Sequence, residues 1–378
     1  MIANSKVLKV GKVFQKSARA FSTGYNVVQV DFKEIQNQDK SLFAKFEEAY
    51  GDNGVGAMVV NNIPSFPEKR KQLLPYAQRL ASLDRKTLET METPEYFYSV
   101  GWSHGREKFR GKPDMLKGSY YGCPLVDRFK MILADGEETY FENKWPKPGV
   151  IDGFEESFKD LGKFINSVGI EVGKNLDKYI KARWENYEVG LIERQLREST
   201  RTTGRLLHYF PVDKEVDMSD MKWCGWHNDH GTLTGLCSAM YLDKDYNEVK
   251  PQDIEDDVSG LFAMNRNHEE IKIKIPQTSL AFQIGETAQI LSGGLLCATP
   301  HSVVCKPNTG GISRNTFALF MEPNPNEDLQ VPEGMSTKNV FRKDPTNQVP
   351  EIDQRWKEGY NFSQFENKTF QMYYEHQK

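Results

Sequence analysis

The second half of this chain repeats its apolar residues at every second position, which restricts it to extended structure. Beyond residue 204 of the 378-residue sequence, strand-length segments separated by turn residues lie at 205–210, 235–242, 260–265, 270–275, 280–284, 288–291, 302–306 and 316–321. Within 270–275, isoleucines alternate strictly with lysines, as in a strand that buries one face. A series of short strands with turn signals between them indicates a β-sandwich or a jelly roll.

The first half mixes helical and extended patterns. Apolar residues recur every three or four positions between Phe154 and Tyr179, which predicts a long helix at 152–182 whose apolar stripe packs on a sheet. Residues 100–150 are rich in glycine, proline and aromatic residues without a regular period, and we expect an ordered loop region there. The other expected elements are strands at 27–30 and 57–60 and helices at 38–50, 67–92 (kinked or restarted at Pro75), 188–199 and, weakly, 352–376.

The N-terminus differs from the rest of the chain in its charge. No acidic residue precedes Asp31, and cations recur every three or four positions, at Lys6, Lys9, Lys12, Lys16 and Arg19. A basic, amphipathic, acid-free leader is typical of an organellar transit peptide, and the sequence around Phe21 resembles a mitochondrial cleavage site. We therefore predict a transit peptide at 1–21 and a location in the mitochondrial matrix. The alternative is a frayed basic tail.

Composition argues against several classes of partner. The formal net charge of −4 provides no positive field for nucleic acid, and no apolar run approaches the roughly 20 residues of a membrane-spanning helix. Five cysteines without a C-x-x-C pair support neither a disulfide framework nor a zinc ribbon, and they fit a reducing compartment. We expect no nucleic-acid partner and no transmembrane segment.

Two histidines and an aspartate are candidate metal ligands. His227 and Asp229 are two residues apart, so on a strand, or in a turn leaving one, their side chains can converge on one ion. On a helix the same side chains would diverge by about 200°. His301 begins a predicted strand after Pro300 and completes the set. Three such ligands leave coordination positions open, as in non-haem Fe(II) centres that activate O₂.

His230 and Glu286 compete for the same role. On a strand His230 would face away from Asp229, so we expect it behind the ligands or at the surface. Glu286 follows Gly285, and this pair predicts the corner of a hairpin and not a ligand.

A candidate carboxylate site follows the second histidine. Arg314 and Thr316 are two residues apart on a predicted strand, so they share a face. The guanidinium offers a planar fork to a carboxylate, and the threonine hydroxyl can add a hydrogen bond to the same anion. The alternative is a structural salt bridge.

Several motifs in one order resemble the 2-oxoglutarate/Fe(II)-dependent dioxygenases of the isopenicillin-N-synthase-like group. The likeness covers about residues 27–325. The family's segments correspond to 54–64 (G-F-F-x-V-x-N-H-G-I-P), 205–211 (R-x-N-Y-Y-P), 227–229 (H-x-D), 284–294 (I-G-D-x-L-Q-x-x-S/T-G-G), 298–303 (the distal histidine) and 314–316 (R-x-S).

The resemblance implies a mainly β protein. Its core would be a double-stranded β-helix, or jelly roll, flanked by helices and preceded by an α/β region. On this basis the chain divides into the leader at 1–21, an N-terminal helical and mixed region at 22–200, the core at 201–325 and a C-terminal extension at 326–378.

The resemblance also implies the reactants. Fe(II) would be held by His227, Asp229 and His301, 2-oxoglutarate would chelate the iron and reach Arg314 and Thr316 with its far carboxylate, and O₂ would take the last position.

Two positions depart from the family pattern. Thr316 stands where the R-x-S motif has serine, and it keeps the hydroxyl. The second tyrosine of N-Y-Y-P corresponds to Phe210, whose missing hydroxyl would remove one co-substrate hydrogen bond, at a cost of about 1 kcal/mol. Tyr209 is the remaining candidate for that bond, although strand alternation would direct its ring to the other face.

These residues predict an oxidoreductase that hydroxylates or desaturates a small organic molecule. The segment 101–113 combines aromatic residues with cations, so it is either a wall of the substrate pocket or an ordinary packed loop. Two alternatives keep the same fold: a catalytically silent accessory subunit of a mitochondrial complex, and a non-oxidative protein that carries Zn²⁺ in the same ligands.

Overall fold

A large sheet forms one wall of the protein. The computed structural model describes residues 26–106, 108–109, 112–212, 222–250, 259–304 and 309–376. The ten-stranded sheet runs in the order β1 (Gln29–Asp31), β2 (Ala57–Asn61), β16 (Leu280–Ile284), β11 (Leu233–Cys237), β18 (Ser313–Met321), β9 (Thr203–Tyr209), β6 (Lys117–Gly122) and β3 (Gly101–His104), and β18 also pairs with β12 (Met240–Leu242), which is followed by β13 (Glu248–Val249).

A smaller sheet forms the opposite wall. Its order is β10 (Lys222–His227), β17 (His301–Val304), β14 (Gly260–Met264) and β15 (Glu270–Lys272). Two hairpins stand apart from both sheets, β4 (Lys108–Phe109) with β5 (Lys112–Pro113) and β7 (Arg128–Ile132) with β8 (Glu138–Glu142). Two facing sheets built from short, mostly antiparallel strands confirm the predicted jelly roll.

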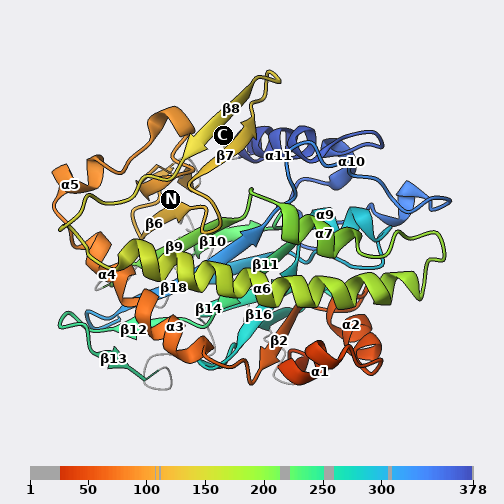
Figure 1. The fold of residues 1–378 in the computed structure, drawn as a ribbon, viewed down its shortest axis with the longest axis horizontal. Coiled ribbons are helices and arrows are strands. Elements are labelled where there is room, and N and C mark those ends of the chain that lie inside the picture. Colours follow the sequence, from red (N-terminus) through yellow and green to blue (C-terminus); the bar gives the residue numbers. More distant parts are fainter. Residues whose placement is uncertain are drawn as a thin grey trace, which may run out of the picture.

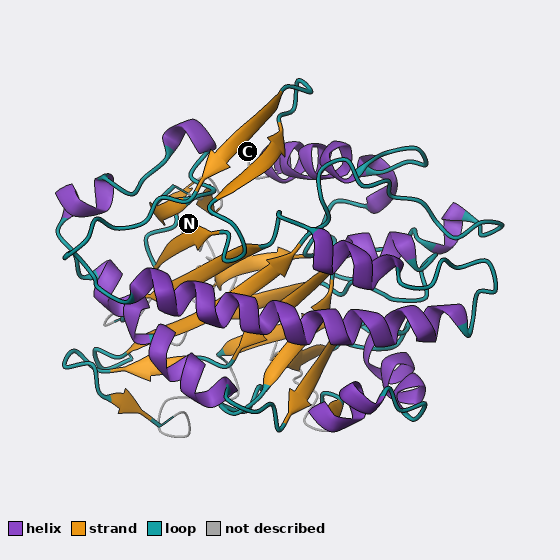
Figure 2. Ribbon diagram, in the orientation of Figure 1, coloured by secondary structure: helices purple, strands orange, loops and turns teal. Residues whose placement is uncertain are grey.

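Helices cover the outer face of the large sheet (Figures 1 and 2). The long helix α6 (Phe154–Lys181) crosses this sheet, as its apolar stripe predicts, and α7 (Leu191–Glu198) packs beside it. Among the described residues the other helices are α1 (Phe32–Asn37), α2 (Leu42–Tyr50), α3 (Phe66–Leu73), α4 (Pro75–Ala81), α5 (Arg85–Glu89), α9 (Glu286–Leu291), α10 (Ile352–Arg355) and α11 (Phe362–His376), with short 3₁₀ turns at Pro94–Tyr96 and Thr337–Asn339.

The interface between α6 and the sheet is tightly packed. Phe158 is fully buried, and its ring makes edge contacts with Tyr120 of β6 and Phe317 of β18. At Gly235 of β11 the helix approaches so closely that a Cβ atom would lie 2.3 Å from Cγ2 of Ile165. Only glycine fits at that point. This packing holds β11 and β18, which carry residues of the site.

Three expectations about local structure are wrong. Residues 100–150 contain the strands β3 to β8, and the large sheet is extended because β6 pairs with β9, a partner distant in sequence, and β3 pairs with β6. Residues 288–291 lie in helix α9 and not in a strand, and Glu286 begins that helix and is no hairpin corner. Every residue of α9 is buried, so no polar face reveals its helical period.

Three other predictions lie wholly or partly outside the described residues or are imprecise. The leader at 1–21 and the end of the predicted strand 302–306 lie outside the described residues. The predicted strand 235–242 is divided into β11 and β12 by a break at Ser238 and Ala239.

Among the residues that the structure describes, no helix is both long and apolar enough to cross a membrane.

We predict that Phe158→Ala lowers the free energy of unfolding by about 3–5 kcal/mol, because it opens a cavity between α6 and the sheet. Chemical denaturation measures this loss. Phe97→Ala is the control, since its ring is 72% exposed and its loss should change stability by less than about 0.5 kcal/mol. Equal effects of the two substitutions would contradict the packing described here.

Candidate metal centre

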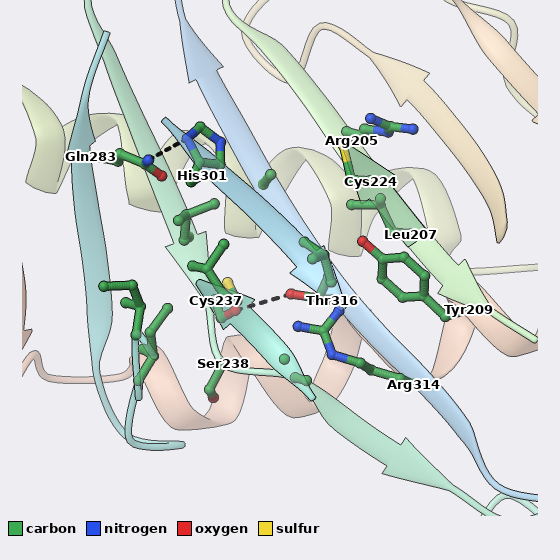
Figure 3. A pocket seen from close by; sticks show the side chains of 18 of the residues that line it. Arg205, Leu207, Tyr209, Cys224, Cys237, Ser238, Gln283, His301, Arg314 and Thr316 are labelled. Carbon is green, nitrogen blue, oxygen red and sulfur yellow. Dashed lines mark hydrogen bonds between the residues drawn. The ribbon is translucent and has the colours of Figure 1, made fainter. Parts of the chain in front are cut away.

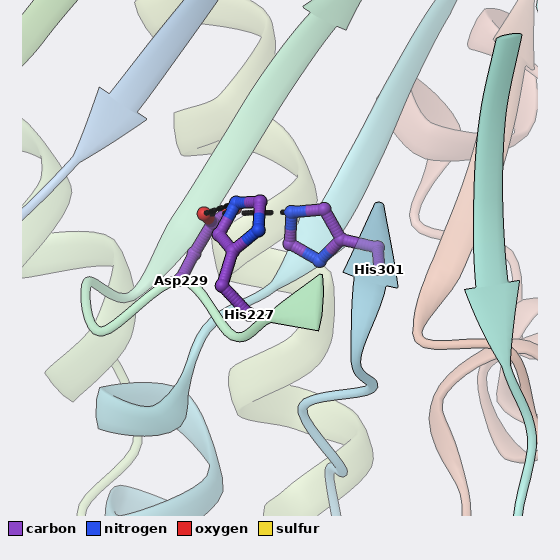
Figure 4. Close-up of side chains that lie close together, drawn as sticks. All are labelled: His227, Asp229 and His301. Carbon is purple, nitrogen blue, oxygen red and sulfur yellow. Dashed lines mark ion pairs between the residues drawn. The ribbon is translucent and has the colours of Figure 1, made fainter. Parts of the chain in front are cut away.

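One strand pair brings the two candidate histidines together. In the antiparallel register of β10 and β17, His227 lies directly opposite His301. The centroids of the two imidazole rings are 4.2 Å apart, and both rings point toward Asp229 (Figure 4). Backbone pairing between two strands therefore brings together two histidines that are far apart in the sequence.

Asp229 completes the set from the turn that leaves β10. Its Oδ1 is 3.9 Å from Nε2 of His227 and 3.7 Å from Nε2 of His301. Two atoms that each bind a metal at about 2.1 Å can lie no more than about 4.2 Å apart, so both separations fit one ion. The three candidate ligands are therefore neighbours in a geometry that suits a metal.

Backbone contacts select the ligand nitrogen of His227. Its Nδ1 lies 2.8 Å from the carbonyl oxygen of Gly225, which places the proton on Nδ1. Nε2 then keeps its lone pair on the side of Asp229, as a metal-binding imidazole requires.

A cross-strand pair orients the other two ligands. Thr234 of β11 and Gln283 of β16 lie opposite each other in the large sheet. The Thr234 hydroxyl donates to Oδ2 of Asp229 at 2.7 Å, which leaves Oδ1 for the ion. The Gln283 amide lies 2.6 Å from Nδ1 of His301.

The orientation of the Gln283 amide follows from its environment. With Nε2 against Nδ1 of His301, the buried Oε1 has no hydrogen-bond partner. Rotating the amide by half a turn lets Oε1 accept the proton of Nδ1, and it frees Nε2 of His301 for the metal. We adopt this orientation because it satisfies both groups.

His230 lies behind the ligands, as expected. Its Nε2 is 3.5 Å from carboxylate oxygens of both Glu322 and Glu366. These two carboxylates also contact the buried guanidinium of Arg201, so the group is a charged cluster on the far side of the turn.

The protonation of His227 depends on a neighbouring thiol. Burial disfavours the imidazolium, but the Cys224 thiolate and the Asp229 carboxylate outweigh burial and raise the pKa of His227 to about 9. The Sγ atom of Cys224 is 3.5 Å from Nδ1 of His227, and this contact helps to lower the pKa of the thiol to about 7 despite its burial. Burial and the positive charge of His227 lower the pKa of His301 to about 4.

A pocket between the two sheets connects the metal ligands with the predicted carboxylate site. His227, Asp229 and His301 line one end of it, and Arg314 and Thr316 of β18 line the other. Figure 3 shows His301, Arg314 and Thr316 around this pocket. The Thr316 hydroxyl donates to the carbonyl oxygen of Cys237 at 3.0 Å, which leaves its lone pairs toward the pocket. Both predicted carboxylate-binding residues therefore share the cavity with the triad.

The tyrosine assignment changes in the structure. Tyr209 lies opposite Arg314 in the β9–β18 register, lines the pocket and stacks its ring 4.9 Å from the guanidinium carbon. Phe210 packs instead on His104 and His208. Tyr209 thus lines the pocket, because Arg205, Leu207 and Tyr209 form the face of β9 that is turned toward it. The expectation that the Tyr209 ring lies on the opposite face is wrong.

The segment 101–113 makes no pocket wall in the part that the structure describes. None of its described residues lines the cavity. Trp102 is instead buried in the core, and His104 contacts Phe210.

Sequence reasoning missed several residues of the site. Cys224, Thr234 and Gln283 touch the ligands, and Arg205, Lys272 and Lys274 line the pocket. The period of two in 280–284 indicates the strand that carries Gln283, but only the register of β16 with β11 shows which ligand it reaches.

Comparison with solved structures identifies the architecture. A full-length Neurospora crassa protein, solved in complex with alpha-KG and thymine, covers 92% of this chain and 96% of its own at a TM-score of 0.61 and 19% identity. The fold is that of the 2-oxoglutarate/Fe(II)-dependent oxygenases. JOX2, solved with 2OG, Fe and JA, aligns over 90% of this chain and 83% of its own at a TM-score of 0.57 and 18% identity.

Sequence comparison points to the same superfamily. The 2-oxoglutarate-dependent dioxygenase ecdK of Aspergillus rugulosus is 24% identical over 232 residues, and scopoletin 8-hydroxylase of Arabidopsis thaliana is 28% identical over 217 residues. The matches cover 58% and 57% of this chain but only 60% and 51% of those relatives. No protein-family model matches the chain.

We predict that Gln283→Leu and Thr234→Val each weaken metal binding about 10- to 100-fold, because they remove the hydrogen bonds that orient His301 and Asp229. Anaerobic titration with Fe(II) or Co(II) measures the affinity. The control is Thr316→Val on the neighbouring strand, whose hydroxyl binds a backbone carbonyl and touches no ligand. Unchanged metal affinity in the first two variants would contradict their assigned role.

We predict that Cys224→Ser strengthens metal binding at pH 7. A metal displaces the proton of His227, so affinity rises with pH until the pKa of that group, about 9, is passed. Without the thiolate this pKa falls toward its ordinary value, and affinity should level off at a lower pH. Metal affinity measured between about pH 6 and 9 tests this prediction. Cys237→Ser is the control: burial raises the pKa of this pocket thiol to about 12, so it carries no charge in that range. Superimposable profiles for wild type and Cys224→Ser would refute the coupling.

Proposed function

We propose that this chain is an oxidoreductase that uses Fe(II), 2-oxoglutarate and O₂ to hydroxylate or desaturate a small organic molecule. The observation that carries the proposal is one cavity lined by both a 2-His-1-carboxylate set and an arginine–threonine pair. The first binds a metal and leaves positions open, and the second suits a carboxylate.

The donor set favours iron. Two imidazoles and one carboxylate, each oriented by a hydrogen bond with a second group, present three ligand atoms within 4.8 Å of one another. Three protein ligands leave about half of an octahedral sphere for other molecules, the arrangement of non-haem Fe(II) oxygenases. Zinc in the same ligands is the competing occupant, and metal analysis of the purified protein separates the two.

The second group in the cavity favours 2-oxoglutarate. Arg314 offers two parallel donors to a carboxylate, and Thr316 keeps the hydroxyl of the family's R-x-S motif. Tyr209 holds its ring against the guanidinium and limits the orientations that Arg314 can adopt. A dicarboxylate bound at this end of the cavity would have its other end free to approach the triad.

The protein's own residues would orient the reactants and exclude water. When bound, Fe(II) would supply the redox chemistry that couples the decarboxylation of 2-oxoglutarate to oxidation of the substrate. The cavity between the sheets has apolar walls from Leu207, Leu236, Val303 and Phe320, which shield this chemistry from bulk solvent.

The similar proteins support a small organic molecule as the substrate, but they do not identify which molecule it is. Their names and complexes include scopoletin, thymine and JA, so they do not point to one compound. An intact ligand set also argues against the accessory-subunit alternative, because a silent subunit has no need of ligand-orienting partners such as Gln283.

We further propose that the protein acts in the mitochondrial matrix. The support is the basic, acid-free sequence of residues 1–21 and the low cysteine content. Association with a mitochondrial complex is compatible with this location. Fluorescent fusions of the full chain and of a chain lacking residues 1–21 test it, and unchanged distribution after the deletion would refute it.

We predict that 2-oxoglutarate binds saturably to the Fe(II) protein in an anaerobic titration. Arg314→Gln should weaken the binding of 2-oxoglutarate by at least about 30-fold, which corresponds to about 2 kcal/mol for the loss of a charged partner. Metal affinity should be unchanged. Arg205→Gln is the matched control, since Arg205 lines the same pocket but hydrogen-bonds Ser119. Failure of the wild type to bind Fe(II) and 2-oxoglutarate together would refute the proposed function, and equal losses in both variants would refute the role of Arg314.

A further inference from the structure

Helix α11 contacts the segment that carries two of the three candidate ligands. Asn228 lies between His227 and Asp229, and its backbone N–H donates to the hydroxyl of Tyr373 at 3.3 Å. Burial and the Glu286 carboxylate raise the pKa of the Tyr373 hydroxyl, so this group stays neutral. A residue about 145 positions away in the sequence therefore holds the backbone between the ligands.

A buried ion pair contacts the same residue from a second direction. Glu286 and Arg355 are joined by two hydrogen bonds, of 2.6 and 2.7 Å, and their side chains are 1% and 0% exposed. Oε1 of Glu286 also accepts from Nδ2 of Asn228 at 3.0 Å. Arg355 comes from α10 in the C-terminal extension and is secured by the carbonyl oxygen of Pro350.

The start of α9 is pressed directly onto the turn. The N–H of Glu286 donates to the carbonyl oxygen of Asp229 at 2.8 Å. A Cβ atom on Gly285 would lie 2.0 Å from the carbonyl oxygen of Gly231, so no side chain fits between the two segments. Displacement of Glu286 would consequently move the backbone of Asp229.

These contacts lie on the side of the turn away from the ligand atoms. Asn228 and Glu286 line a second, smaller cavity with Glu351 and do not line the pocket of the triad. Because the side chain of Asn228 is engaged there, its two neighbours are directed toward the pocket.

We propose that the C-terminal extension is a positioning part of the metal centre: Tyr373 and the Arg355–Glu286 pair hold Asn228, and through it set His227 and Asp229 in ligand geometry. The inference rests on the proposed metal site. It concerns the energy of metal binding and is independent of which substrate is oxidised.

The first test removes one hydroxyl. Tyr373→Phe keeps the ring and loses the partner of the Asn228 N–H, so Co(II) or Fe(II) should bind about tenfold more weakly, at the lower end of what outer partners contribute. The unfolding temperature of the metal-free protein should stay close to that of the wild type. Tyr360→Phe is the control, because Tyr360 precedes α11 and its ring packs on the core beside Lys357.

The second test separates the contact to Asn228 from the ion pair itself. Glu286→Gln with Arg355→Met removes both buried charges and keeps an acceptor for Asn228. Glu286→Leu with Arg355→Met removes the charges and the acceptor. We expect the second double variant to bind Co(II) more weakly than the first and to show an altered visible spectrum, while both have similar unfolding temperatures.

The outcomes distinguish this inference from the proposed function. Wild-type protein that binds no metal would refute the proposed site and the inference with it. Wild-type binding with unchanged affinity in Tyr373→Phe, and equal affinity in the two double variants, would overturn only the positioning role. A loss of affinity in Tyr360→Phe equal to that in Tyr373→Phe would assign the effect to general stability and would also overturn it.

Discussion

The antiparallel pairing of β10 with β17 is the interaction on which the site depends. It sets His227 opposite His301, and every other feature of the centre is arranged around these two rings. Because side chains alternate along a strand, a slip of one residue in this register would turn one imidazole out of the pocket. The geometry of the candidate metal centre therefore depends on this one register of β10 and β17.

The large sheet contributes orientation and not ligands. Thr234 and Gln283, neighbours across β11 and β16, reach over the pocket to Asp229 and His301. Farther along the same sheet, β18 presents Arg314 and Thr316. Since α6 packs on the outer face of these strands, the long helix holds the orienting residues in place although it touches no reactant.

The centre is also supported from outside the jelly roll. The turn after β10 is contacted by Glu286 of α9 and Tyr373 of α11, and Arg355 of α10 holds Glu286 in place. A buried ion pair is costly to desolvate and adds little stability by itself. Glu286 of this pair accepts a hydrogen bond from Asn228, and a charge pair that is itself fixed can hold the turn in one position.

The secondary structure could be predicted where one face of an element is polar. The alternation at 270–275 and the stripe of α6 each reveal a buried side. The helix is present as predicted, and the strand is present over Glu270–Lys272 only. The prediction failed for α9 and for β3 and β6. All of α9 is buried, so its sequence has no alternation of polar and apolar residues with a helical period. Strand β6 is defined by its pairing with β9, and that pairing is not visible in its own sequence.

The candidate ligands, the candidate carboxylate site and the class of fold all follow from residue spacing along the chain. H-x-D spacing restricts His227 and Asp229 to one side of an extended segment, and Arg314-x-Thr316 shares a face for the same reason. The three-dimensional arrangement shows which ring of β9 lines the pocket, which groups orient the candidate ligands and how the C-terminal extension reaches the turn. These features depend on strand register and on contacts between distant segments, and such contacts leave no periodic trace in a single sequence.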